Sequence, residues 1–232
     1  MIAVQPFSHG RPRCLLLCAG LLLTAGAGRA QSILSDFNLN ADGWHAYTAA
    51  DPNTVVVYTA NGGTNGSGAI ILQEPANGAN DYFDAPAQFL GNQAAYYGGT
   101  LSFDLKLSLS WNGTEADMVV LTGNNTSIAF SAPQANWPVT TNYTSYSFKL
   151  DGTQGWTLAG SSTLATTQQI SSVLGSLTDL RILGDWTNSQ DNDLLDNVKL
   201  AAVPEPGTVA LLAFGGALML GAAFRRRARP AA

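Results

Sequence analysis

Residues 100–111 carry the clearest pattern in the chain, an unbroken alternation of apolar and polar side chains. The apolar positions are Leu101, Phe103, Leu105, Leu107, Leu109 and Trp111. A period of two puts them on one face, so the stretch predicts a long antiparallel strand buried on one side. Shorter stretches rich in β-branched or aromatic residues predict strands at 53–60, 68–73, 116–123, 127–132, 145–150, 180–184 and 196–203.

One segment has a helical period instead. Its apolar residues recur at i, i+3, i+4 and i+7, namely Ile170, Val173, Leu174 and Leu177. This spacing predicts a helix of about ten residues across one end of the sheets, with Thr166 or Thr167 as its cap. Many short strands separated by Gly-, Asn- and Pro-rich turns, with a single helix, predict an all-β fold made of two packed sheets.

The segment "SDFNLNADGWHAYTA", residues 35–49, predicts the opening strand of this sandwich. Phe37 and Trp44 are its expected core residues, and Asp42-Gly43 is its expected turn. The sandwich domain is therefore expected to cover residues 31–202.

The first 30 residues have the pattern of a secretory signal peptide. Arg11 and Arg13 precede an apolar run that is short for a bilayer span, and small residues predict cleavage by signal peptidase after Ala30. An uncleaved anchor is the alternative. Both cysteines, Cys14 and Cys18, lie in this run, so the exported form is expected to lack disulfides, thiolate metal sites and a cysteine nucleophile.

The other end of the chain predicts a transmembrane helix over residues 208–224. This segment carries no charge, and at 1.5 Å per residue it reaches about 25 Å, close to the hydrocarbon thickness of a bilayer. A basic tail at 225–229 follows it. Basic clusters stay on the cytoplasmic side, so the body of the protein is expected to lie outside.

Three features in order mark residues 203–232 as a sorting segment. Val203-Pro204-Glu205-Pro206 comes first, then one apolar span, then Arg225, Arg226 and Arg227. The arrangement resembles the PEP-CTERM sorting signal. The resemblance implies recognition by exosortase in a Gram-negative bacterium that makes exopolysaccharide. It also implies transient attachment to the inner membrane, followed by release or anchoring at the cell envelope. A permanent single-span anchor is the alternative.

The middle of the chain resembles the laminin B domain (laminin IV type A) over about residues 80–200. The residues that carry the likeness are Ala85-Pro86, Phe89 to Gln93, Tyr97-Gly98-Gly99, 117–123, 146–156, 177–182 and 195–198. The resemblance implies a jelly-roll β-sandwich related to carbohydrate-binding modules and galactose-binding-like domains. The cysteine-rich modules that flank this domain in laminins are absent from the sequence, so a laminin-like network role does not carry over.

Charge separates the body from the two ends. The whole chain has a net charge of −5, but residues 31–203 contain four basic and fifteen acidic residues, a net charge of −11. Such a body should repel nucleic acid, so no nucleic-acid partner is expected. The acidity can serve solubility, or it can attract divalent cations.

Sandwiches of the resembled kind often hold a structural calcium between the loop of the first strand and the last strand. The residues at the matching places are Asp36, Asn38, Asp42 and Asp196. Calcium prefers several hard oxygen ligands, which these side chains offer. The alternative is a solvated acidic loop, and Asp191 and Asp193 lie in a second acidic loop nearby.

Exposed aromatic rings can stack on sugars, and the best candidates are Trp137 and Trp186, in polar loops. Trp111 and Trp156 are expected in the core. Apart from His45 the body holds no histidine, which excludes triads needing a second imidazole and zinc sites built on histidine. Glu74 and Glu115 are its only glutamates, and neither lies in a recognisable catalytic motif.

The sequence therefore predicts an exported, non-enzymatic protein of the cell envelope or extracellular matrix. It would bind polysaccharide, with exopolysaccharide as the expected partner, or act as a structural or adhesive surface component. A glycan-active enzyme on the same scaffold is the alternative, with its carboxylates in the usual acid–base roles.

Overall fold

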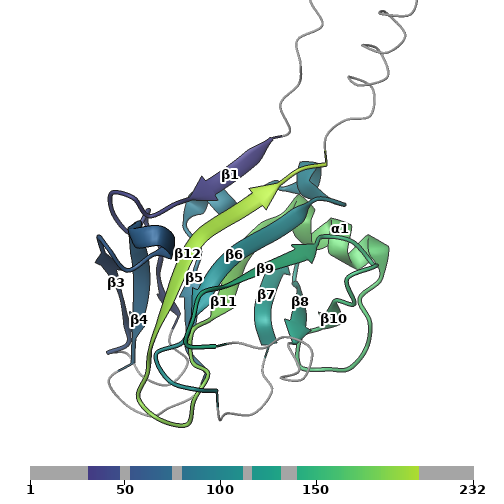
Figure 1. Ribbon diagram of the computed structural model, residues 1–232. Helices are drawn as coiled ribbons and strands as arrows, with labels where there is room; N and C mark the ends of the chain where they lie inside the picture. Colours follow the sequence, from purple (N-terminus) through teal and green to yellow (C-terminus); the bar gives the residue numbers. More distant parts are fainter. Residues whose placement is uncertain (1–30, 48–52, 75–79, 112–116, 132–139, 204–232) are drawn as a thin grey trace, which may run out of the picture. The chain divides into compact units, whose positions relative to one another are not determined.

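The computed structural model describes residues 31–47, 53–74, 80–111, 117–131 and 140–203 (Figure 1). The predicted signal peptide, the predicted transmembrane segment, Trp137 and Glu115 lie outside these ranges. Within them, no helix is both long and apolar enough to cross a membrane.

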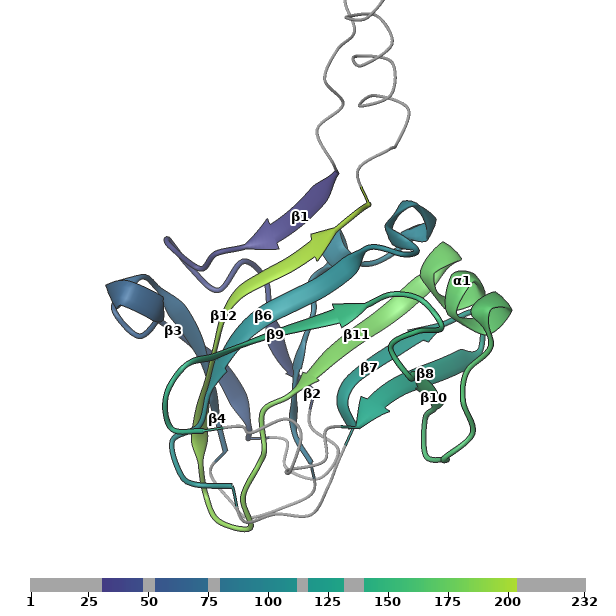
Figure 2. The same ribbon diagram turned by 45° about the vertical axis from the view of Figure 1, so that its right-hand side comes forward.

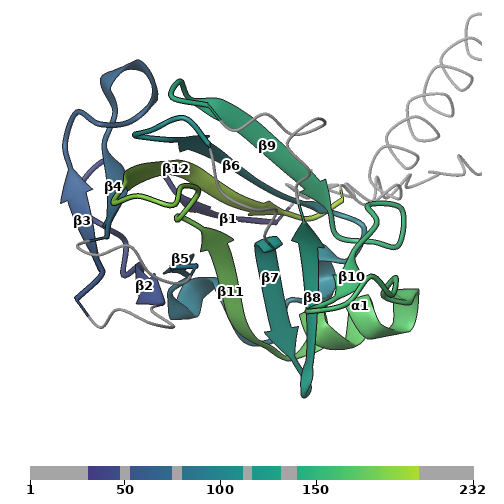
Figure 3. The same ribbon diagram turned by 90° about the horizontal axis from the view of Figure 1, so that it is seen from below.

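Two antiparallel six-stranded sheets form the domain, which confirms the predicted jelly-roll β-sandwich (Figure 3). Sheet A has the order β3-β4-β12-β6-β9, and β1 also pairs with β12. Its strands are β1 (Ser32–Ser35), β3 (Val55–Thr59), β4 (Ala69–Gln73), β6 (Thr100–Lys106), β9 (Thr144–Lys149) and β12 (Asn192–Ala201). Sheet B has the order β10-β8-β7-β11-β5-β2. Its strands are β2 (His45–Tyr47), β5 (Tyr82–Asp84), β7 (Asp117–Gly123), β8 (Thr126–Ser131), β10 (Thr157–Leu158) and β11 (Leu177–Leu183).

The core between the sheets is built largely from aromatic rings. Phe148 of sheet A contacts Phe130 and Trp156, with ring centroids 5.1 and 6.4 Å apart. Edge-to-face and offset ring contacts of this kind add to the free energy gained by burying the rings. Because the described residues contain no cysteine, burial stabilises this part of the chain without a disulfide.

The strand with the clearest alternation is shorter than its pattern predicts. Leu101, Phe103 and Leu105 are buried as expected, but β6 ends at Lys106 and Leu109 is 43% exposed. Beyond Lys106, the Ser108 backbone N–H donates to Asp193 Oδ1 (2.8 Å) and no longer to a neighbouring strand. A side-chain acceptor thus ends the backbone ladder.

The single predicted helix is confirmed as α1 (Thr167–Gly175). Thr166 caps it through a capping box, in which the Gln169 N–H donates to Thr166 Oγ1 (3.2 Å) and the Thr166 N–H donates to Gln169 Oε1 (2.8 Å). The helix lies beside β7 and β8 (Figure 2). It approaches Gly123 so closely that a Cβ there would lie 2.4 Å from the Val173 carbonyl oxygen. Leu177, which was expected in the helix, begins β11.

The predicted single opening strand is wrong, since residues 32–47 form two strands in different sheets. β1 pairs with β12 in sheet A, and β2 pairs with β5 in sheet B. The chain crosses between the sheets through the predicted turn, where Asp42 and Gly43 have φ of 51° and 82°. Phe37 and Trp44 flank this turn and are buried, as predicted.

The last strand, β12, lies at the centre of sheet A and contains a buried carboxylate. A register shift on the β6 side begins at Asp196, and Asn197 has a φ of 53°. Asp196 Oδ2 accepts hydrogen bonds from Thr64 N (2.8 Å), Thr64 Oγ1 (3.0 Å) and Ser67 Oγ (3.0 Å). Asp196 Oδ1 accepts one from Asn197 N (2.7 Å). The carboxylate therefore fastens the 64–67 turn to the central strand.

We predict that Asp196→Ala lowers the free energy of unfolding by ~3 kcal/mol, because it leaves several buried donors without an acceptor. Urea unfolding followed by tryptophan fluorescence measures the change. Asp36→Ala is the matched control, since Asp36 only accepts a bond from Asn38 N (3.2 Å) in an exposed turn, and it should cost about 0.5 kcal/mol. Equal losses in the two variants would contradict the role given to Asp196.

Candidate carbohydrate-binding face and buried acidic cluster

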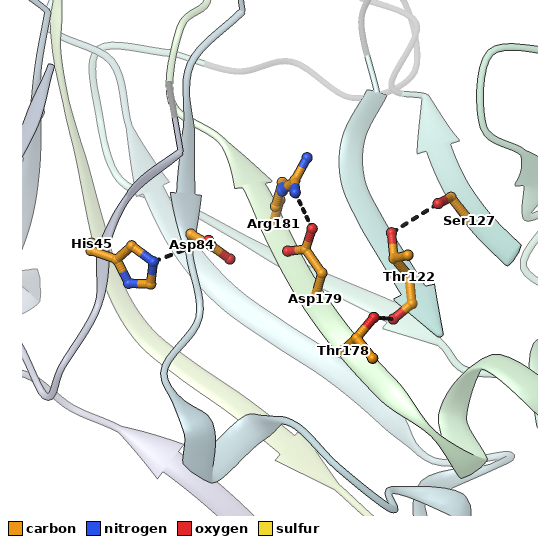
Figure 4. Close-up of polar contacts among 7 residues, drawn as sticks. All are labelled: His45, Asp84, Thr122, Ser127, Thr178, Asp179 and Arg181. Atoms are coloured by element: carbon orange, nitrogen blue, oxygen red, sulfur yellow. Dashed lines mark hydrogen bonds and ion pairs between the residues drawn. The ribbon is translucent and has the colours of Figure 1, made fainter. Parts of the chain in front are cut away.

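The outer surface of sheet B, here called the sheet B face, presents a row of polar and aromatic side chains. Strand register places them together, because β2 pairs His45 with Asp84 and Tyr47 with Tyr82, and β11 pairs Arg181 with Asp84. Residues two apart on a strand share a face. The members of the face are His45, Tyr47, Tyr82, Asp84, Thr122, Ser127, Thr178, Asp179 and Arg181 (Figure 4 draws seven of them).

Two tyrosine rings and a guanidinium form one part of the sheet B face. The Arg181 guanidinium lies over the Tyr47 ring, 3.4 Å from its centroid. The Tyr47 and Tyr82 rings meet edge to face, with centroids 6.3 Å apart. These contacts restrict the rotamers of all three side chains, and both tyrosines remain partly exposed.

Charged groups continue the row. His45 Nε2 lies 3.1 Å from Asp84 Oδ2, with 63% of the histidine side chain exposed. Arg181 pairs with Asp179 through its Nη2 atom. Burial, together with a hydrogen bond to Asp84 and the charge of Asp84, raises the pKa of Asp179 to about 6, and Arg181 opposes the rise. Two acidic side chains thus share one part of the face near neutral pH.

Hydroxyl groups complete the row towards β8. Thr178 Oγ1 donates to the Thr122 carbonyl oxygen (3.1 Å), and the Thr122 and Ser127 hydroxyls lie 2.9 Å apart. The face therefore combines partly exposed rings, a bidentate donor, carboxylate acceptors and hydroxyls. Rings pack against the apolar faces of a sugar, and the polar groups can donate to and accept from its hydroxyls.

The structure contradicts the prediction that Trp186 is exposed and binds sugar. Trp186 is 2% exposed, because the loop between β11 and β12 turns its ring inward against Trp111, with centroids 5.0 Å apart. Its Nε1 donates to the Leu183 carbonyl oxygen (3.0 Å), so the indole presents neither face nor edge to solvent. Trp137 lies outside the described residues. Trp111 and Trp156 are in the core, as predicted.

Two of the residues predicted to bind calcium have carboxylates that accept hydrogen bonds. Asp36 Oδ1 accepts from Asn38 N. Asp196 accepts the four bonds described above. Asp36, Asp42 and Asp196 do not form a group of three carboxylates whose oxygens approach within 4.8 Å. The calcium site at Asp36, Asn38, Asp42 and Asp196 stays a prediction.

Within the described part of the chain, one such group does occur, at Glu74, Asp185 and Asp191. Each offers a carboxylate oxygen within 4.8 Å of the other two, and all three side chains are buried. Burial, then the charges of Asp191 and Asp81, raise the pKa of Asp185 to about 7. Burial, then the charge of Asp191, raises the pKa of Asp193 to about 9. This acidic cluster could hold a cation.

Reasoning from the sequence missed both sites. The signal for the sheet B face was the alternation in "HAY" (45–47), "YFD" (82–84) and "DLR" (179–181), where the residues of the face take every second position. The cluster had a weaker signal in the acidic loop at 191–193. Its third member, Glu74, lies more than one hundred residues earlier and is brought there by the pairing of β4 with β12.

The two-sheet fold and the C-terminal sorting segment define the class, which is an exported β-sandwich protein. Sequence comparison gives its family. The chain matches the Laminin B (Domain IV) model over residues 82–212, and it belongs to this family. Residues 202–227 match the PEP-CTERM protein-sorting motif, which indicates an exported, cell-envelope-associated protein processed by exosortase. Both resemblances drawn from the sequence are thereby confirmed. No curated protein sequence matches the chain.

Several solved structures are similar to this chain. The L4b domain of human laminin alpha-2 superposes with a TM-score of 0.58 at 12% identity, covering 75% of this chain and 98% of that domain. The family 11 carbohydrate-binding module of the Clostridium thermocellum cellulase Lic26A-Cel5E gives 0.47 at 13% identity, covering 76% and 98%. The CBM22-1 xylan-binding domain of Paenibacillus barcinonensis Xyn10C gives 0.44 at 15% identity, covering 76% and 98%.

Asp179 leads to a prediction about pH. Its pKa is raised from 3.8 to about 6 in the folded protein, so the native state holds this proton more tightly than the unfolded chain does. The stabilising contribution is therefore complete below about pH 4 and is lost as the pH rises through 6. We predict that the stability of the wild type relative to Asp179→Asn falls by about 2 kcal/mol between pH 4 and pH 7. Urea unfolding at both pH values measures it, and a constant difference would contradict it.

Proposed function

We propose that this protein is a non-enzymatic polysaccharide-binding component of the cell envelope or extracellular matrix of a Gram-negative bacterium. After transient attachment to the inner membrane, exosortase would process its C-terminal segment. The observation that carries the binding proposal is the sheet B face, on which Tyr47, Tyr82 and Arg181 lie beside carboxylates and hydroxyls. Regular strands hold these groups in place before a ligand arrives, which lowers the entropic cost of binding.

Charge selects the class of polysaccharide. The body has a net charge of −11 from four basic and fifteen acidic residues, and the sheet B face itself contains Asp84 and Asp179. A polyanionic glycan would be repelled by this field. The proposal is therefore a neutral polysaccharide, whose hydroxyls can accept from Arg181 and donate to the two carboxylates.

The alternative of a glycan-active enzyme depends on carboxylates that can reach a substrate. Glu74 is buried, and Glu115 lies outside the described residues. A reducing-sugar release assay on the same polysaccharides separates the two functions. Binding without release supports the proposal. Release that disappears in Glu74→Gln or Glu115→Gln would establish the enzyme instead.

We predict that Tyr47→Ala weakens binding to a neutral polysaccharide by at least about tenfold, which corresponds to about 1.4 kcal/mol. The variant removes one ring and the surface on which Arg181 rests. A glycan array identifies the polysaccharide, and isothermal titration calorimetry measures the affinity. Lys149→Ala is the matched control, because Lys149 is exposed on sheet A. Full affinity in Tyr47→Ala, or an equal loss in Lys149→Ala, would rule out the sheet B face as the binding site.

Processing gives a further prediction. We expect mass spectrometry of the protein recovered outside the cell to show an N-terminus at Gln31 and no peptides from the segment after Pro206. Replacing Pro204, Glu205 and Pro206 with alanine should leave export intact and keep the C-terminal segment attached. Normal removal of that segment from the variant would show that the motif does not direct processing.

A further inference from the structure

The acidic cluster lies where β4 ends and β12 begins, at one end of sheet A. The backbone N–H of Glu74 donates to the Asp191 carbonyl oxygen (3.4 Å), directly after the Gln73–Asn192 pair of the ladder. Glu74 and Asp191 are therefore cross-strand neighbours. Like charges in this position repel and destabilise a sheet. The pair therefore requires either a shared proton, as in the side-chain hydrogen bond between Glu74 and Asp191, or a positive charge between them.

Two carboxylate oxygens at this end of β12 are buried without a hydrogen-bond partner. Asp191 is 1% exposed; its Oδ2 accepts from Trp186 N (3.4 Å), while its Oδ1 has no partner. Asp193 is fully buried; its Oδ1 accepts from Ser108 N, while its Oδ2 has none. A buried acceptor without a donor costs about 1–3 kcal/mol, and more when it is charged. These oxygens are free to bind a cation.

Among the described residues, no basic side chain forms an ion pair with the acidic cluster. The groups that act on Asp185 and Asp193 by charge are other carboxylates, mainly Asp191. The ion pairs found among the described residues, His45–Asp84 and Arg181–Asp179, both lie on the sheet B face. A bound cation would offset the repulsion that remains among these carboxylates.

A surface pocket gives access to the cluster. It has a volume of about 470 Å³ and is lined by Asn53, Val55, Gln73, Glu74, Gln190 and Asn192. Glu74 lines this pocket and belongs to the cluster, so the pocket and the cluster meet at this residue. Four of the lining side chains are amides, whose oxygens are hard ligands of the kind that calcium accepts.

We propose that Glu74, Asp185 and Asp191 form a binding site for a hard divalent cation of the calcium class, entered from this pocket. An all-oxygen set without histidine or cysteine favours calcium or a similar ion over zinc and copper. The site fastens the β11–β12 loop to the end of β4. It is separate from the sheet B face, and it shares no residue with the set predicted from the sequence.

The test uses the purified full chain in a mild detergent, with Ca²⁺ alone as the probe. Thermal unfolding in EDTA and in millimolar Ca²⁺ should differ by ~5 °C or more in the wild type. Isothermal titration calorimetry should give one Ca²⁺ per chain at this site. No shift and no binding heat in the wild type would overturn the proposal.

The decisive variant is Asp191→Asn, which keeps the shape of the side chain and removes its charge. The variant should lose the Ca²⁺ shift. Asp185→Asn is the second variant if the first does not fold. A Ca²⁺ shift that persists in both variants would overturn the proposal.

Asp36→Asn and Asp42→Asn are matched controls that carry the same chemical change at the residues predicted from the sequence. Both should keep the full Ca²⁺ shift. Loss of the shift in these variants, with retention in Asp191→Asn, would place calcium between the first loop and the last strand and would refute the cluster as its site.

Discussion

The domain depends on one strand pairing, the insertion of β12 into the centre of sheet A. This strand pairs with β6 along one edge and with β4 and β1 along the other, so three separate parts of the chain meet on it. It is also the last element of the domain, and most of its contacts join residues distant in sequence. Such long-range pairing forms late and slowly in β-sandwiches. The sandwich is thus complete only when the chain up to Ala201 is present, directly before the segment that matches the sorting motif. Removal of that segment would leave the whole sandwich intact.

The use of aromatic residues divides the domain into a core and a surface. All four tryptophans of the described residues are buried, and with the phenylalanines they fill the space between the sheets. The described residues contain no cysteine, so this part of the chain needs the apolar area, because burial must offset the loss of conformational entropy. The rings left partly exposed on the sheet B face are tyrosines, whose hydroxyls tolerate water. This division explains why Trp186 closes the core and does not serve as a sugar platform, and why Tyr47 and Tyr82 are better suited to that task.

Short sequence patterns correctly predicted the features that depend on neighbouring residues, namely one helix and the buried side of a strand. The helix followed from the spacing of Ile170, Val173 and Leu174 and from a threonine that can cap it, and the buried side of β6 followed from alternation. The crossing of the opening segment between sheets did not, because Phe37 and Trp44 would be core residues in either arrangement. Both candidate sites arise from residues far apart in sequence, and their convergence depends on strand order, which no short window contains. The hydrogen bonds from the 64–67 turn to Asp196 Oδ2 could not be predicted either, because the residues of this turn carry no periodic signal.

A comparison within β12 shows why the acidic cluster differs from an ordinary buried acid. Asp196 and Asp191 lie on the same strand or at its start, and both are buried. Around Asp196 the chain supplies four donors, two of them hydroxyls from a turn shaped to reach it. Around Asp191 it supplies hydrogen bonds from Trp186 and Thr187 and a second carboxylate as cross-strand neighbour, and Asp191 Oδ1 has no partner. The fold therefore supplies enough hydrogen-bond donors to a buried carboxylate whose role is only structural, as at Asp196. Buried carboxylate oxygens that lack a hydrogen-bond partner in such a domain therefore point to a ligand from outside the chain and not to poor packing.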